Sequence, residues 1–178
     1  MSALKHFKLI TRHRHAVIRH GFKAGIFFQT LKHDLSKYSP TEFLAGAKHF
    51  KGNKSPNEGE RALYGYSSAW LHHKGRNRHH FEYWNDYNPA TKRVEPVKMP
   101  IKFVKEMFCD RVAASKIYKG KDYTDSHPLE YFTNGKETRK LNRAIHPETS
   151  DLIESWLTIL ANEGEEAAFK RVRETKEY

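Results

Sequence analysis

Residues 100–118, PIKFVKEMFCDRVAASKIY, carry the clearest helical pattern in the chain and decide the fold class that we expect. The i, i+3, i+4 spacing of a helix gives this segment one mixed face, made of Phe103, Glu106, Met107, Asp110 and Ala114. A buried carboxylate is costly unless a cation or a metal ion pairs with it. The pattern therefore predicts a partner for Glu106 and Asp110, which is either a basic residue such as Arg111 or a metal ion.

Helix signals continue on both sides of this segment. Ser39-Pro40-Thr41-Glu42 is typical of a capping box, in which Ser39 bonds to the first turn and Glu42 bonds back to the cap. Pro40 suits the first helical position, where no N–H is needed. Ser55 begins a similar cap within the loop 51–60, and Thr149 is expected to cap a last amphipathic helix. Apolar residues recur at helical spacing in four further segments: 3–21, 26–35, 60–73 and 79–87.

The expected architecture is an all-α, single-domain helical bundle over residues 1–178. Its metal-site core covers about residues 5–118, and a C-terminal helical extension covers about residues 147–175. Residues 119–146 are polar and are expected to be irregular or to form short helices. No β-hairpin is predicted.

Composition limits the class of protein. The 178 residues contain no long apolar run and no signal-peptide pattern, so we expect a soluble, cytoplasmic protein without membrane contact. Cys109 is the only cysteine, which excludes an internal disulfide and a CxxC zinc site. The formal net charge of +11 favours anionic partners such as nucleotides, phosphorylated metabolites or nucleic acid.

The histidines are numerous and grouped. The chain has 12, and several stand close together in sequence: His13, His15 and His20; His72 and His73; His79 and His80. His33 lies directly beside Asp34, and a turn before the Pro40 helix does not by itself require that pair. Imidazole and carboxylate together suit divalent Mn, Fe, Co, Ni or Zn, so one or two such ions are expected.

Helix geometry suggests how these residues meet. Two antiparallel helices joined near Gly25 would bring His15 close to His33 and Asp34, since each lies about nine residues, or roughly 13 Å, from the turn. His15 is the expected ligand on the first helix, with His13 and His20 as alternatives. The stretch HHKGRNRHH, residues 72–80, adds four histidines, and Asp110 adds a second carboxylate.

Three stretches together resemble a family of small uncharacterised prokaryotic and phage proteins that share a domain of unknown function: HDLSKYSPTEF, AWLHHKGRNRHHFEYW and MPIKFVKEMFCD. This likeness covers about Lys5 to Tyr118 and continues more weakly to the end. The order His, His-Asp, His, His, Asp also resembles the HD-domain metal-dependent phosphohydrolases. That resemblance implies an HD-like fold, metal ligation by His73, His79 and His80, and an active-site role for Lys37. LHHKGRN is similar to a His-Thr-Thr-Gly-Arg stretch in one branch, which implies that Arg76 touches phosphate.

The expected function is metal-dependent hydrolysis of a nucleotide or related phosphate ester. Asp34 is the best candidate to bridge two ions or to orient the attacking water, and Lys37 faces the same cavity because it lies three residues further on. Two alternatives stay open. The first is a non-enzymatic nucleic-acid- or protein-binding module with a structural metal or none, and the second is an oxygenase with two metal ions. Four histidines are expected at the surface: His6, His49, His127 and His146.

Overall fold

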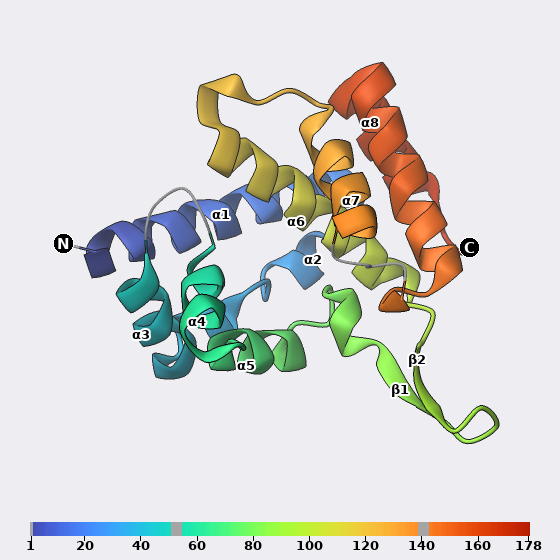
Figure 1. Cartoon of the computed structure of the whole chain (residues 1–178). Coiled ribbons are helices and arrows are strands. Elements are labelled where there is room, and N and C mark those ends of the chain that lie inside the picture. The colour runs from blue at the N-terminus through green and yellow to red at the C-terminus, as the bar shows by residue number, and fades with distance from the viewer. Residues whose placement is uncertain (1, 51–54, 139–142) are drawn as a thin grey trace.

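The computed structural model describes residues 2–50, 55–138 and 143–178 (Figure 1). It is mainly helical, which confirms the predicted fold class. The α-helices are α1 (Ser2–Ala24), α2 (Phe27–Thr30), α3 (Pro40–His49), α4 (Pro56–Tyr64), α5 (Ser68–Arg76), α6 (Ile101–Lys119), α7 (His127–Thr138) and α8 (Pro147–Glu174). Short 3₁₀ helices are η1 (Leu35–Tyr38), η2 (Phe81–Tyr83) and η3 (Gly120–Asp122). Every helix in the described part is too short or too polar to cross a lipid bilayer.

α6 lies at the centre of the packing, against α1, α7 and α8. Its residues 104–109 are all buried, as expected for a helix in the interior of a protein. On the α8 side, the ring of Phe108 packs against Trp156 and Phe169 at centroid distances of 6.0 and 5.3 Å. Burying each such side chain stabilises the fold by about 1.5–3 kcal/mol. This contact fixes the rotation of α6 and leaves its acidic residues on the side that faces α1 and α2.

α1 and α2 approach closely because residue 21 is a glycine. A Cβ atom at Gly21 would lie only 2.2 Å from Oγ1 of Thr30. Thr30 is fully buried, and its hydroxyl donates to the carbonyl of Phe27 at 2.8 Å. The backbone N–H of His33 in turn donates to the carbonyl of Thr30 at 3.0 Å. The contact at Gly21 thus positions the turn that carries the His-Asp pair.

Several expected helix boundaries are wrong. The helix expected over 26–35 is only α2, because the chain passes through turn residues and Asp34 takes a left-handed conformation with φ of 54°. The helix expected over 60–73 is divided between α4 and α5. Gly21 lies inside α1, which runs to Ala24. Residues 119–146, expected to be irregular or to form short helices, contain η3 and the 12-residue helix α7. Residues 139–142 of this segment and residues 51–54 of the expected loop lie outside the described residues.

The α-helix expected over residues 79–87 is not formed: residues 81–83 form η2, and a β-hairpin begins at Asn85. Strand β1 (Asn85–Asn88) pairs antiparallel with β2 (Arg93–Pro96). The hairpin stands out from the helices beside the start of α6. Half of the residues in each strand are exposed and none is buried, and the sequences NDYN and RVEP lack the alternation of apolar and polar residues that marks a half-buried strand.

Helix starts agree with the sequence in position but not in every contact. α3 begins at Pro40 as expected, and α4 begins at Pro56, at the expected second cap but before the expected helix start at residue 60. Neither Ser39 nor Ser55 makes a side-chain cap bond. Thr149 is not a cap. It lies inside α8, where its Oγ1 accepts from the backbone N–H of Met99 at 3.2 Å.

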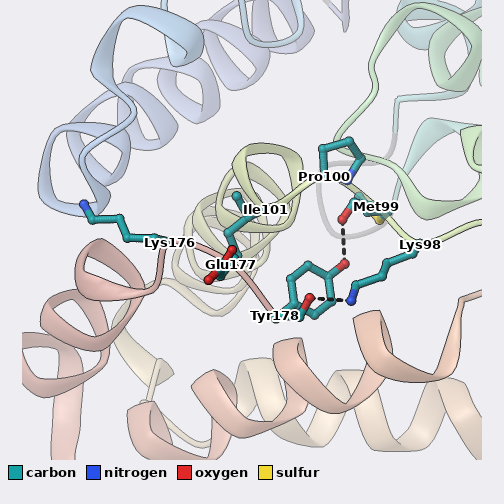
Figure 2. Close-up of a pocket in the computed structure, with 7 residues that line it drawn as sticks. All are labelled: Lys98, Met99, Pro100, Ile101, Lys176, Glu177 and Tyr178. Carbon is teal, nitrogen blue, oxygen red and sulfur yellow. Dashed lines mark hydrogen bonds between the residues drawn. The ribbon is translucent and has the colours of Figure 1, made fainter.

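The last residues of the chain border a cavity of about 310 Å³ next to the start of α6 (Figure 2). The Tyr178 hydroxyl donates to the carbonyl of Met99 at 2.6 Å, and Lys98 donates to the carbonyl of Tyr178. The lining offers the carboxylate of Glu177 but no histidine or cysteine. With a single side-chain carboxylate and no imidazole or thiol, this lining lacks the clustered donors of a metal site.

Candidate metal centre

Histidines and carboxylates from five parts of the chain converge on the buried side of α6. α1 contributes His13, the turn after α2 contributes His33 and Asp34, α5 contributes His73, the segment after α5 contributes His79 and His80, and α6 contributes Asp110. Six of the seven expected ligands therefore meet. Among the described residues, their potential ligand atoms form two groups of four that share Asp34.

The first group surrounds Oδ2 of Asp34. Nε2 of His33 lies 3.3 Å from this oxygen, and Nε2 of His13 lies 3.7 Å from it. The two imidazole nitrogens are 3.5 Å apart, and His13 is also 2.8 Å from Oδ1 of Asp110. Ligands held about 2.1 Å from one ion lie roughly 3.0–3.4 Å apart in octahedral or tetrahedral geometry. The observed separations are close to that range, so these four side chains could hold a metal ion.

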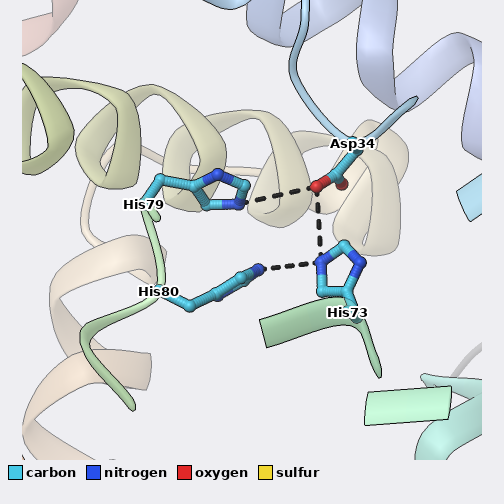
Figure 3. A group of neighbouring side chains, drawn as sticks. All are labelled: Asp34, His73, His79 and His80. Carbon is cyan, nitrogen blue, oxygen red and sulfur yellow. Dashed lines mark hydrogen bonds and ion pairs between the residues drawn. The ribbon is translucent and has the colours of Figure 1, made fainter. Parts of the chain in front are cut away.

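The second group surrounds the other oxygen, Oδ1 (Figure 3). Nε2 of His73 lies 3.3 Å from Oδ1 of Asp34, and Nε2 of His79 lies 3.5 Å from it. Nε2 of His80 lies 2.9 Å from that of His73. Three imidazole nitrogens and one carboxylate oxygen thus point toward a common space.

Two atoms of the second group are buried without a hydrogen-bond partner among the described residues. They are Oδ1 of Asp34 and Nε2 of His79, on side chains that are 2% and 1% exposed. An unsatisfied buried polar atom costs about 1–3 kcal/mol. Because both atoms carry lone pairs that face the same space, a bound cation would satisfy them together. The donor set therefore fits a metal ion.

Buried glutamates hold the histidines from behind. Oε1 of Glu106 lies 2.9 Å from Nδ1 of His33 and 3.2 Å from Nδ1 of His79. Oε2 of Glu42 lies 2.7 Å from Nδ1 of His73. A carboxylate that accepts from Nδ1–H fixes the tautomer and orientation of the ring and leaves Nε2 free to bind a metal. We therefore assign Glu106 and Glu42 to the support of the ligands.

The carboxylates of Asp34 and Asp110 are ionised, which is the form that binds a metal ion. Burial alone would raise the pKa of Asp34, but the charges of His33 and Lys37 bring that pKa well below its usual range. Burial would also raise the pKa of Asp110, but its hydrogen bond to His13 and the charges of His13, His79 and His33 together bring that pKa well below its usual range. Burial and the nearby His79 lower the pKa of His80, which keeps that imidazole neutral.

His33 is the exception, because in the metal-free chain it keeps a proton. Burial lowers the pKa of His33, yet the adjacent Asp34 charge and the bond to Glu106 raise it to about 10. Metal binding at Nε2 must therefore displace a proton, as is general for histidine ligands.

Lys37 is placed as expected and Arg76 is not. Nζ of Lys37 lies 2.6 Å from Oδ2 of Asp34. Arg76 is the last residue of α5 and is exposed, and its guanidinium donates to the backbone carbonyl of His72 at 3.4 Å. Arg76 therefore lies outside the cluster, because α5 directs His73 toward it, and the phosphate contact expected of Arg76 stays a prediction.

The expected first-helix ligand is also corrected. His15 is exposed, whereas His13 is buried and lies in the first group. The buried histidines of α1 are His6, His13 and His20, which follow one another at seven-residue intervals and therefore share a face. That spacing was the available signal for His13. Glu42 had none, because a carboxylate three residues after Ser39 is equally typical of a capping box.

A cavity of about 140 Å³ opens beside the second group. Lys37, His73 and His80 line one end of it, and residues of α1, α3 and α4 line the other. The cluster therefore has a space next to it that can admit a small molecule.

The fold and this cluster define a mainly helical protein with a buried histidine–carboxylate centre that could hold metal. The chain belongs to a family of unknown function, DUF5662, whose model matches residues 2–159. The match includes every residue of the cluster and confirms the predicted likeness to an uncharacterised family. No curated protein and no solved structure matches the chain.

Proposed function

We propose that the protein is a metal-dependent phosphohydrolase that binds two divalent ions and cleaves a phosphate ester. The main observation in support of this proposal is the position of Asp34, whose two oxygens face two different groups of ligand atoms. One ion would be held by His13, His33, Asp34 and Asp110, and the other by Asp34, His73, His79 and His80. A carboxylate shared in this way suits a pair of ions that act together on one phosphate group.

The types of ligand atom limit which metal ions the site can bind. Imidazole nitrogen and carboxylate oxygen suit Mn, Fe, Co, Ni and Zn, and the absence of thiolate from the two groups makes copper(I) a poor candidate. When bound, such ions polarise a phosphoryl group and lower the pKa of water.

Lys37 supplies the positive charge that a phosphate ester requires from the protein. Burial would lower the pKa of Lys37, but the adjacent charges of Asp34 and Asp110 raise it, so the ammonium stays protonated. Its side chain lines the cavity next to His73 and His80. In that position it can neutralise phosphate oxygens in a space that water enters only partly, where electrostatic stabilisation is strong.

The cavity limits how much of the substrate is enclosed. Its volume of about 140 Å³ is below the roughly 300 Å³ at which sites for drug-sized ligands begin. The phosphoryl group and the unit attached to it fit, and any nucleobase would lie outside. The net charge of +11 favours approach of an anionic ester.

The proposal is tested by a phosphatase screen of untagged protein. Phosphomonoesters and nucleotides are tested with added Mn²⁺, Co²⁺, Ni²⁺, Fe²⁺ or Zn²⁺. Asp34→Asn should abolish turnover, while the matched change Asp151→Asn, at an exposed position on α8, should leave it unchanged. Equal trace activity in wild type and Asp34→Asn would identify contamination and would overturn the proposal.

One observation favours a second candidate. Most proposed ligands are almost fully buried, as in structural metal sites, and the same ligand types suit two iron ions. Bound metal without hydrolysis would favour a structural role in a binding module. Two redox-active irons would favour an oxygenase.

A further inference from the structure

His6 is buried at the end of the cavity that lies away from the metal centre. Its side chain was expected at the surface, but it is only 5% exposed and lines the cavity. Its ring packs on Phe43 and Phe50 at centroid distances of 5.4 and 5.7 Å. Nδ1 is buried and has no hydrogen-bond partner among the described residues. A buried polar atom without a partner calls for an explanation, and a ligand in the cavity that His6 lines would supply one.

The cavity connects this imidazole with the metal centre. His6 precedes His13 by seven residues on α1, or about 10 Å along the helix axis. Leu9 and Ile10, which lie between them, also line the cavity. Lys37 and His73 line it near the cluster. A molecule whose phosphoryl group lies at Lys37 would therefore extend along α1 toward His6.

The packing around His6 depends on a glycine in α3. A Cβ atom at Gly46 would lie 2.3 Å from Nε2 of His6 and 2.7 Å from Cε1. Gly46 also lines the cavity. The absence of a side chain at this position gives the imidazole the space it occupies.

Three uncharged polar side chains line the cavity among its apolar ones: His6, Ser55 and Asn57. Burial and the nearby Lys37 charge lower the pKa of His6, so its imidazole is neutral and can both donate and accept. Ser55 and Asn57 carry the same two capacities. A hydroxyl group also donates and accepts, so it matches these residues better than a second anionic group does.

We propose that His6 is a substrate-binding residue that hydrogen-bonds a hydroxyl group on the organic part of a phosphate monoester. The inference rests on the proposed function and names its substrate class as an ester of a hydroxylated carbon skeleton. Both a sugar phosphate and the ribose of a nucleoside 5′-phosphate present this chemistry.

The test uses three esters and two variants of the full chain loaded with Mn²⁺. Ribose 5-phosphate and adenosine 5′-monophosphate carry hydroxyls, and phenyl phosphate carries none. His6→Phe keeps an aromatic ring to pack on Phe43 and Phe50 but cannot form the proposed hydrogen bond to the substrate. His6→Gln keeps a donor and an acceptor. Melting temperatures of both variants show whether the fold is intact.

The two hydroxylated esters should depend on His6. His6→Phe should raise KM about tenfold or more for ribose 5-phosphate and adenosine 5′-monophosphate, with a smaller change in kcat. Phenyl phosphate should change by less than about twofold, and His6→Gln should restore most of the loss. An equal loss for all three esters would show a structural role only and would overturn the inference. A loss confined to adenosine 5′-monophosphate would indicate a base contact and would also overturn it.

Binding separates this inference from the proposed function. Calorimetry with non-hydrolysable phosphonate analogues of ribose 5-phosphate and phenyl phosphate measures affinity without turnover. If wild type hydrolyses none of the esters, the proposed function fails. A His6-dependent preference for the ribose analogue would then still support the binding role, and the lack of such a preference would overturn it.

Discussion

Glu106→Gln should weaken metal binding about 10- to 100-fold without changing any proposed ligand, because carboxylates that support ligating histidines typically contribute that much. One oxygen of Glu106 accepts from Nδ1 of both His33 and His79, and the other accepts from Gln29 at 2.5 Å. Glutamine has nearly the same size but only one accepting oxygen, so it cannot satisfy all three donors.

The size of the effect follows from ligand linkage. At a Mn²⁺ concentration about 100 times the wild-type Kd, one site stabilises the folded chain by about 2.7 kcal/mol. A Kd that is 10 to 100 times higher reduces this to about 1.4 to 0.4 kcal/mol at the same concentration. For a chain of this length, 1 kcal/mol shifts Tm by about 2–4 °C. Mn²⁺ should therefore raise Tm by about 5–11 °C in wild type and by about 1–6 °C in Glu106→Gln.

The assay is thermal unfolding at pH 7 with and without Mn²⁺, and Glu165→Gln is its matched control. Although burial opposes it, hydrogen bonds from His33 and His79 lower the pKa of Glu106 to about 2. Lys116 and Lys23 likewise lower the pKa of Glu165 to about 2, away from the cluster. A carboxyl group with a lowered pKa stabilises the folded chain above pH 4.5, and this stabilisation is lost as pH falls toward 2. Without metal, each substitution should therefore lower the free energy of unfolding at pH 7 by up to about 3 kcal/mol.

Only Glu106→Gln should reduce the increase in Tm that Mn²⁺ causes. The reasoning is refuted if wild type and Glu106→Gln show the same increase, or if Glu165→Gln loses it to the same extent.

Three further results are expected. Gly21→Ala should lower Tm by about 2–12 °C, because overpacking against Thr30 costs roughly 1–3 kcal/mol; an unchanged thermal melting curve would contradict the close contact. Burial lowers the pKa of His20 to about 4, so up to about 3 kcal/mol of stability present above pH 6.5 should be lost as pH falls toward 4. The free energy of unfolding, measured with urea between pH 6.5 and 4, should depend less on pH in His20→Leu than in wild type, and identical slopes would contradict this role of His20. Lys37→Met should lower kcat while the Mn²⁺ content measured by mass spectrometry stays unchanged, and loss of metal would assign Lys37 to the binding site instead.

The helices with strong sequence signals were predictable and the weakly marked elements were not. The position of α6 follows from a long apolar repeat after Pro100, and α3 begins at Pro40 as its sequence indicates. The hairpin escaped prediction because β1 reads NDYN and is half exposed, so neither composition nor alternation marks a strand. α2 ends at Thr30 and a turn over residues 31–34 follows it. The left-handed conformation of Asp34 keeps this turn from continuing as α-helix, and aspartate tolerates that conformation without marking it in the sequence.

The candidate site was predicted by residue type better than by geometry. The clustering of His and Asp residues, together with the family resemblance, indicated six of the side chains that the structure brings together. The choice between His13 and His15 depended on the rotation of α1 about its axis. That rotation is set by tertiary packing at Gly21 and α6, and the seven-residue spacing of His6, His13 and His20 was the sign of it in the sequence. The role of Glu42 depends on α3 lying beside α5, a contact between segments that are about 30 residues apart.

Equilibrium dialysis against Mn²⁺, with metal quantified by plasma mass spectrometry, tests the shared role of Asp34 most directly. Asn tolerates the left-handed backbone at this position, so Asp34→Asn removes the carboxylate with little effect on the turn. Wild type should bind about two Mn²⁺ ions per chain, and Asp34→Asn should bind fewer than about one, because both groups lose a charged ligand. Wild type without bound Mn²⁺, or Asp34→Asn that binds as much as wild type, would contradict a metal centre built around Asp34.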